Sequence, residues 1–72
     1  MLELIKIDTP YITLGQFLKR LNVISSGGQA KFFLQEEIVR INGEVETRRG
    51  RKVYPQDQVE ISGLGIVMVV SE

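Results

Sequence analysis

Residues 39–45 read Val-Arg-Ile-Asn-Gly-Glu-Val, and this stretch decides the fold because it specifies a β-hairpin. Its apolar residues alternate with Arg40, which is the two-residue period of a strand with one buried face. Asn42-Gly43 is a turn dipeptide that tolerates positive φ at both positions, and Val45 continues into the return strand. The sequence therefore predicts an antiparallel hairpin near the middle of the chain.

Upstream of the hairpin, the hydrophobic period changes to that of an amphipathic helix. Apolar residues recur at i, i+3, i+4 and i+7, namely Leu14, Phe17, Leu18 and Leu21. Thr13 followed three residues later by Gln16 is a capping-box pattern, which satisfies free backbone N–H groups at a helix start. The pattern predicts a helix from Thr13 to about Asn22.

A second helix is expected between the first helix and the hairpin, over roughly residues 27–37. Ser26 and Gln29 form another capping-box pattern. The predicted buried stripe consists of Ala30, Phe33, Leu34 and Ile38. Because the link between the two helices is short, they should form a helix pair.

The remaining apolar runs are predicted to be strands. They cover residues 2–7, 53–54, 59–61 and 66–70, and turn residues separate them. No internal repeat or linker divides the 72 residues, so we expect a single domain over residues 1–72. Its expected fold class is α+β, with a two-helix pair packed on a small curled, mostly antiparallel sheet.

The residue inventory argues against an enzyme. The chain has no histidine and no cysteine, which removes the usual general base, the Ser-His pair and most transition-metal sites. Glu36 and Glu37 are adjacent on a helix and diverge, and Gly27-Gly28 lacks the ending of a phosphate loop. We therefore expect no catalysis, no metal, no cofactor and no small-molecule substrate.

The charges are distributed unevenly, although the formal net charge is zero. From Lys19 to Lys52 there are eight basic and four acidic residues, a net charge of +4, and the rest of the chain carries −4. A local potential of this kind can attract a polyanion to a neutral protein. The longest apolar run, residues 66–70, is too short to span a bilayer, and residues 1–7 do not form a signal peptide. We expect a cytoplasmic protein without a membrane partner.

Three groups of residues are candidates for anion binding, and each has a plainer alternative. The start of the second helix offers free N–H groups and glycines that let a phosphate approach; the alternative is a flexible linker before an ordinary cap. Four bases around Gly50 are too closely spaced to be paired by Glu44 and Glu46, although they could instead protect a strand edge. The third group is Arg40 and Asn42 on the outward side of the hairpin strand; the alternative is that they are ordinary residues facing solvent. The candidates are Ser26, Gly27, Gly28, Gln29, Lys31, Arg40, Asn42, Arg48, Arg49, Arg51 and Lys52.

In its order of elements, the chain resembles the RNA-binding domain named after small-subunit ribosomal protein four, also called the alpha-L RNA-binding motif. The resemblance covers a core motif of about residues 12–61, and its segments are Leu14–Leu18, Ser26–Leu34, Val39–Gly43 and Asp57–Val59. The Gly-Gly-Gln-Ala-Lys and Glu-Val-Glu-Thr-Arg-Arg-Gly-Arg-Lys stretches look most like the small stand-alone members of the YaaA/YbcJ type. The chain departs from the family pattern at Gly27, where an arginine is common, and at Glu37 and Gln56, where glycines are common.

The resemblance implies that the second-helix start and the hairpin face bind RNA. The function expected is therefore a non-catalytic module that recognises structured RNA, ribosomal RNA being one possibility. The alternative is a protein-interaction adaptor that kept the fold with weak or no RNA binding. Phe32 and Tyr54 could stack on unpaired bases, but packing against the rest of the domain is the preferred role for both.

Overall fold

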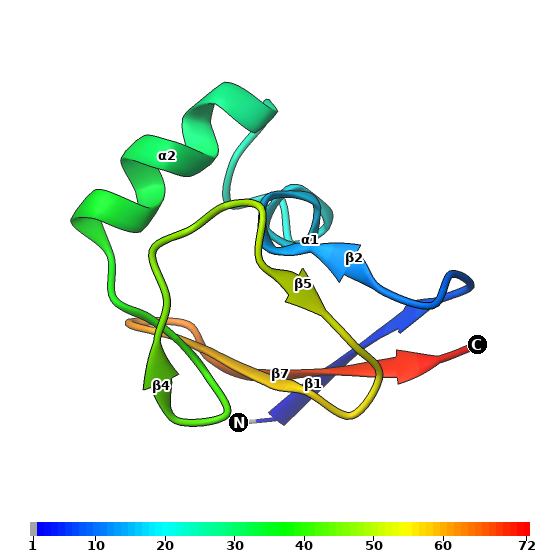
Figure 1. The fold of residues 1–72 in the computed structure, drawn as a ribbon. Helices are drawn as coiled ribbons and strands as arrows, with labels where there is room; N and C mark the ends of the chain where they lie inside the picture. The colour runs from blue at the N-terminus through cyan, green and yellow to red at the C-terminus, as the bar shows by residue number, and fades with distance from the viewer. Residues whose placement is uncertain (1) are drawn as a thin grey trace.

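The structure is a computed structural model that describes residues 2–72, so Met1, the first residue of the predicted domain, lies outside the described residues. Two helices cover one side of a five-stranded sheet, and the other side of the sheet faces solvent (Figure 1). The elements in chain order are β1 (Leu2–Ile7), β2 (Ile12–Thr13), α1 (Leu14–Arg20), α2 (Gly27–Glu36), β3 (Val39–Ile41), β4 (Glu44–Val45), β5 (Lys52–Val53), β6 (Gln58–Ile61) and β7 (Gly65–Ser71).

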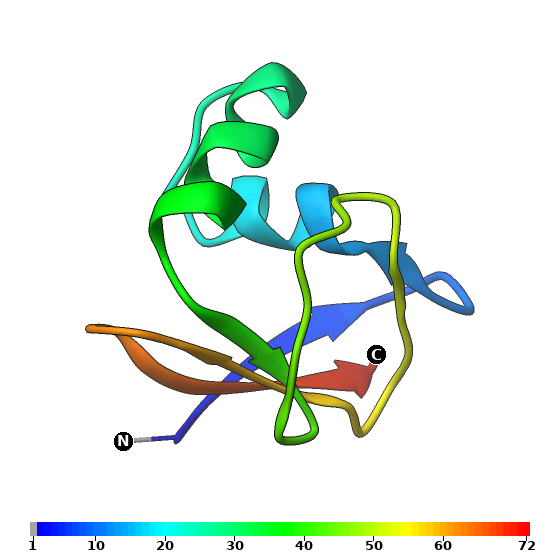
Figure 2. The same ribbon diagram turned by 60° about the vertical axis from the view of Figure 1, so that its left-hand side comes forward.

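The main sheet has the strand order β1-β7-β6-β3-β4, and only the β1–β7 pair is parallel. A separate two-stranded ladder joins β2 to β5, with Ile12 opposite Val53. Figure 2 shows the segment between β4 and β5 rising from the sheet to the helices. The α+β class and the mostly antiparallel sheet predicted from the sequence are confirmed.

The hairpin that decides the fold forms as predicted. Asn42 and Gly43 have φ values of 52° and 89°, the pair of positive angles that a tight hairpin turn requires. The Asn42 side chain also ties the turn to the segment before β6, because its Nδ2 donates to Asp57 Oδ1 and its Oδ1 accepts from the Gln58 N–H, both over 3.0 Å. The side-chain polar atoms of Asn42 are thus used in joining the hairpin turn to β6.

The first helix begins as expected, whereas the second begins differently. Thr13 and Gln16 form the predicted capping box. At α2, Ser26 is the N-cap residue but makes no side-chain cap bond within the described residues, so that capping prediction was wrong. Gln29 Oε1 instead accepts hydrogen bonds from the N–H and the hydroxyl of Ser25, over 2.6 and 3.0 Å.

The core lies between the helices and the inner face of the sheet. Phe17, Leu18, Ala30 and Leu34 come from the helices and are buried, as the helical period predicted. The fully buried strand residues include Ile7, Val39, Ile41, Val53, Val59, Ile61 and Val69. Within residues 2–72, no helix is long and apolar enough to cross a membrane.

The burial of three apolar side chains was predicted incorrectly from the sequence. Ile38 was assigned to the buried helical stripe, but α2 ends at Glu36 and Ile38 is exposed on the way to β3. Phe33 is only half-buried. Phe32 was expected to pack under the first strand, yet it is 66% exposed on α2. The Ile38 error arises because the helix ends early, whereas Phe32 and Phe33 are exposed or half-buried because the core covers the second helix along a narrow stripe at Ala30 and Leu34.

Candidate nucleic-acid interface

The arginine loop, which we define as residues 46–52, rests on the start of α1. The N–H of Leu14 donates to the Arg51 carbonyl over 2.8 Å, and the N–H of Gly15 donates to the Arg49 carbonyl over 2.9 Å. These two bonds satisfy N–H groups that a helix start leaves without partners inside the helix. These bonds fix the loop backbone against α1, and so they fix the positions from which its side chains extend.

Glu46 is the buried carboxylate that organises this loop. It is 7% exposed and accepts five hydrogen bonds, from the N–H groups of Thr47 and Arg48 and from the guanidinium groups of Arg48 and Arg51. Both guanidinium contacts are ion pairs at 3.0 Å. The sequence-based expectation that Glu46 would not pair these arginines was wrong, because the chain folds back around this one carboxylate.

The ion pairs change the ionisation of both partners. The side-chain hydrogen bond from Arg48 holds the pKa of Glu46 well below its usual value, at about 2, and bonds from the Arg48 N–H and from Arg51 act in the same direction. The same hydrogen bond raises the pKa of Arg48. Glu46 therefore stays ionised and offsets one of the four positive charges of the loop, so the loop keeps a net charge of +3 from residues 46–52.

Arg49 connects the loop to the second helix. Its Nη1 donates to the carbonyl oxygen of Gly27 over 3.1 Å. A groove of about 270 Å³ lies beside this contact. It is lined by Thr13, Gly15, Gln16, Lys19, Gly27, Arg49 and Gly50. The structure thus brings together the second-helix start and the arginine cluster, two of the three groups that the sequence singled out.

The third group does not join them. Arg40 is opposite in parity to Val39 and Ile41, which are buried, so it lies on the outer face of the sheet, away from the helices. Its neighbour across the ladder to β6 is Glu60. Asn42 is occupied by the hairpin bonds described above. The remaining candidates at the helix start are exposed, including Ser26, Gly28, Gln29 and Lys31.

Lys52, the last residue of the arginine loop, contacts Tyr11, which forms a pair of aromatic side chains with Tyr54. Its Nζ lies 4.8 Å from the centre of the Tyr11 ring, and this ring is 5.7 Å from that of Tyr54. A cation over an aromatic face is held by electrostatic attraction. Tyr54 contacts Tyr11 but stays 46% exposed, so it does not pack in the core.

Sequence reasoning missed several residues of this surface. Lys19 entered only the charge count, yet it lines the groove with Gln16 and Arg49. Its signal was available, because Lys19 lies on the polar side of the first helical stripe and three residues after Gln16. No signal in the sequence identified Glu46 as buried. Among residues 2–72, no group of three His, Cys, Asp or Glu side chains is placed to hold a metal ion.

Comparison with known proteins identifies the family of this chain. A family profile described as S4 domain matches residues 5–70. The chain is also 58% identical over 67 residues to a protein of Bacillus subtilis (strain 168) named "Probable ribosome maturation protein RlbA", and the match covers 93% of this chain and 94% of that protein.

Proposed function

The chain belongs to the S4 domain family, whose members generally bind RNA, and we propose that this protein is a non-catalytic module that grips structured RNA with the arginine loop and the start of α2. Residues 1–72 act as one RNA-binding domain with residues 12–61 as its core motif. The observation that carries the proposal is the Arg49–Gly27 hydrogen bond, which joins the two anion-binding elements into one surface.

The proposed interface contains the groove and the cations around it. Arg49 and Lys19 line the groove, and Lys31 is exposed in the second turn of α2. Arg48 remains 75% exposed in its side chain despite its ion pair, so its guanidinium can also face a phosphate. Gly27 has no side chain and a Cβ there would meet nothing within 4 Å, so a phosphate can approach the backbone at the start of α2. Ser26, Gln29, Arg51 and Lys52 complete this surface.

Arg40 and Asn42 are left outside the proposed contact surface. Arg40 lies on the outer sheet face, and Asn42 is committed to the hairpin. Both were candidates from the sequence because they lie on the side of the hairpin strand opposite the buried Val39 and Ile41. An RNA whose phosphate backbone lies against the groove would contact the helix side of the sheet only.

The RNA proposed is ribosomal RNA in a maturing ribosomal particle. The similar Bacillus protein supports this choice, because its name describes a role in ribosome maturation. The cytoplasm is the compartment that such a role implies. Crosslinking in cells followed by sequencing of the attached RNA would identify the target, and recovery of messenger RNA fragments without ribosomal RNA would contradict this part of the proposal.

The mode of binding can be tested by titrating a structured RNA at several salt concentrations. Phosphate contacts release counterions, so about five neutralised phosphates would give a log-log slope of roughly −3.5 on single strands to −4.5 on duplex. Absence of binding at low salt, or a flat dependence on salt, would refute the proposed interface.

A protein-interaction adaptor is the second candidate. The observation that favours it is the outer face of the sheet, where Leu4 and Val45 are 60% and 59% exposed. Such side chains are common at contact surfaces, but single exposed residues also occur on ordinary surfaces. A protein that copurifies with this chain after nuclease treatment, and is lost with Leu4→Asp, would favour the adaptor.

A further inference from the structure

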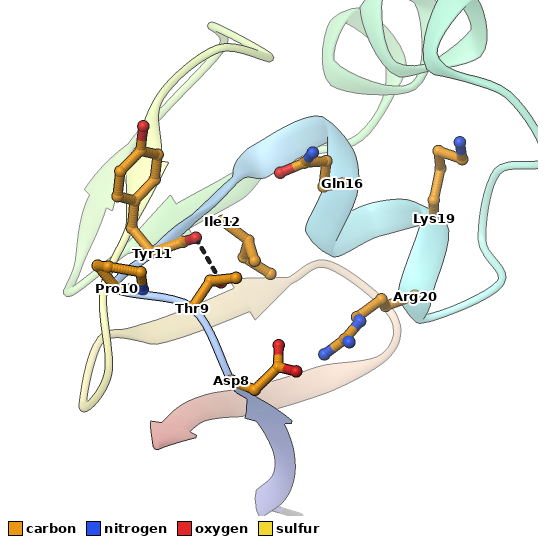
Figure 3. Close-up of a pocket in the computed structure, with 8 residues that line it drawn as sticks. All are labelled: Asp8, Thr9, Pro10, Tyr11, Ile12, Gln16, Lys19 and Arg20. Atoms are coloured by element: carbon orange, nitrogen blue, oxygen red, sulfur yellow. Dashed lines mark hydrogen bonds between the residues drawn. The ribbon is translucent and has the colours of Figure 1, made fainter. Parts of the chain in front are cut away.

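A second and larger hollow lies beside the groove, between the β1–β2 loop and α1. Its volume is about 670 Å³, within the roughly 300–1,000 Å³ range of small-ligand sites. Residues 8–12 form one wall, and Gln16, Lys19 and Arg20 of α1 form the other (Figure 3). The hydroxyl of Thr9 donates to the Tyr11 carbonyl over 2.9 Å, which fixes the shape of the loop wall. The candidate RNA contacts described above do not use this loop.

The α1 wall of this hollow presents donors and positive charge. Nη1 of Arg20 donates to the carbonyl oxygen of Lys6, so the guanidinium is held at the edge of the hollow. Gln16 Oε1 accepts the Thr13 N–H, and its amide NH₂ group is the part left to meet a ligand. Lys19 is exposed on the same wall. These groups suit the phosphate of a nucleotide.

The loop wall has different chemistry. Figure 3 shows Pro10 and Tyr11 at one end of the hollow and the Asp8 carboxylate at the other, turned toward Arg20, with Ile12 between them. Ile12 is buried and supplies an apolar surface. A carboxylate accepts hydrogen bonds only, and every nucleic-acid base carries at least one N–H donor on an edge that is free when the base is unpaired. This wall suits a base, whereas the negative charge of Asp8 disfavours a phosphate there.

The hollow is continuous with the proposed RNA interface. Gln16 and Lys19 line both the hollow and the groove at Gly27 and Arg49. Lys52, at the end of the arginine loop, lies over the Tyr11 ring. A strand whose backbone follows the groove therefore passes the mouth of the hollow.

We infer that this hollow receives one unpaired nucleotide of the bound RNA. Its phosphate lies against Lys19, its base packs beside Tyr11 and over Ile12, and the Asp8 carboxylate accepts a base N–H. This inference rests on the proposed RNA-binding function and adds to it a preference for RNA with a bulge or loop. Aromatic and apolar surfaces with polar groups for base edges are the usual means of recognising unpaired RNA bases.

Asp8→Asn gives the sharpest test, because simple charge attraction and the inference predict opposite results. Binding is measured by fluorescence anisotropy on two RNA hairpins that differ only in a single-nucleotide bulge. Wild-type protein should bind the bulged hairpin at least about tenfold more tightly. Asp8→Asn should lose about fivefold or more on the bulged hairpin and nothing on the paired one, because a charge-assisted hydrogen bond is weakened. Glu44→Gln, which removes the same charge from the exposed strand β4, should leave the ratio of the two affinities unchanged.

Two results would overturn the inference while leaving the RNA-binding proposal intact. One is equal affinity for both hairpins. The other is tighter binding of both hairpins by Asp8→Asn, as removal of a repulsive charge would produce. Failure of the wild-type protein to bind either RNA at low salt would instead reject the proposed function itself, and the inference with it.

Two further measurements identify the ligand and the residues that it contacts. A 4-thiouridine at the bulge should photo-crosslink to a peptide containing residues 8–12, and crosslinks confined to the arginine loop would contradict the inference. Free AMP and GMP, followed by NMR shifts of residues 8–12, should bind no tighter than about 1 mM. Micromolar binding of a free mononucleotide would overturn the assignment to RNA in favour of a soluble nucleotide.

Discussion

Arg49 Nη1 and the Gly27 carbonyl oxygen are 3.1 Å apart, although 22 residues separate them along the chain. This contact sets the distance between the arginine loop and the first turn of α2. The loop is held at its other end by Glu46 and from below by the first N–H groups of α1. The proposed RNA surface therefore has a fixed width before any RNA is bound, which lowers the entropy cost of binding.

Arg49→Ala should reduce affinity for structured RNA at least about tenfold and lower the salt slope by about 1, because one phosphate contact is lost. Arg40→Ala is the matched control, since it removes the same charge from the outer face of the sheet. It should change affinity less than about twofold. Both are measured by anisotropy at three or more salt concentrations. Equal losses for the two variants would mean that net charge, and not the groove, determines binding.

Leu34→Ala should destabilise the fold by about 2–5 kcal/mol, because Leu34 is buried in the core and its truncation leaves a cavity. Lys31→Ala, three residues earlier on an exposed position of the same helix, should leave the thermal midpoint almost unchanged while weakening RNA binding. Denaturant unfolding and RNA titration on both variants give the comparison. Unfolding caused by Lys31→Ala would show that the orientation of α2 described here is wrong.

Acid should destabilise the protein through Glu46. Its pKa is about 2 in the folded protein against 4.5 for an unperturbed glutamate, so the carboxylate contributes stability that is fully present above pH 4.5. This contribution is lost as the pH falls from 4.5 toward 2. Thermal midpoints between pH 7 and pH 2 should therefore fall more steeply for the wild type than for Glu46→Gln. The variant should also be less stable at pH 7, by about 1–3 kcal/mol, because charge-assisted hydrogen bonds are weakened. Parallel pH profiles would exclude Glu46 as the titrating group.

Gln56→Gly should stabilise the protein by about 0.5–1 kcal/mol. Gln56 has a φ of 76°, a left-handed conformation that favours glycine over a residue with a side chain. The control is Gln58→Gly, which makes the same chemical change within strand β6 and should destabilise by a similar amount. Urea unfolding of both variants measures the difference. A loss of stability in Gln56→Gly would mean that its side chain contributes more than its strained backbone costs.

The sequence predicted those features that depend on local patterns. The first helix, its capping box and the hairpin at Asn42-Gly43 each follow from a few adjacent residues, and each was confirmed. The parity of Arg40 was also read correctly, although its consequence was not. The two-residue period of a strand shows that a side chain points away from the core. It does not show which other elements lie on that side of the sheet.

Features that depend on distant contacts could not be predicted. The burial of Glu46 arises because Arg48 and Arg51 turn back onto it while the loop closes over α1. The side chain of Gln29 bonds to Ser25 and not to Ser26, because the spacing of three residues does not determine which of two adjacent serines the side chain reaches. The hollow beside Tyr11 exists only because β1, β2 and α1 meet there, and no spacing in the sequence encodes that meeting.

The place of β7 in the sheet has a consequence for how the protein is made. β7 lies between β1 and β6, so among the described strands β1 has no hydrogen-bonding neighbour except one that is translated more than fifty residues later. The nascent chain must therefore carry β1 without its sheet partner until residues 65–71 have been made, with Ile5 and Ile7 uncovered. The sheet is completed only once β7 has left the exit tunnel, and until then the unpaired strand is a site where two nascent chains could associate.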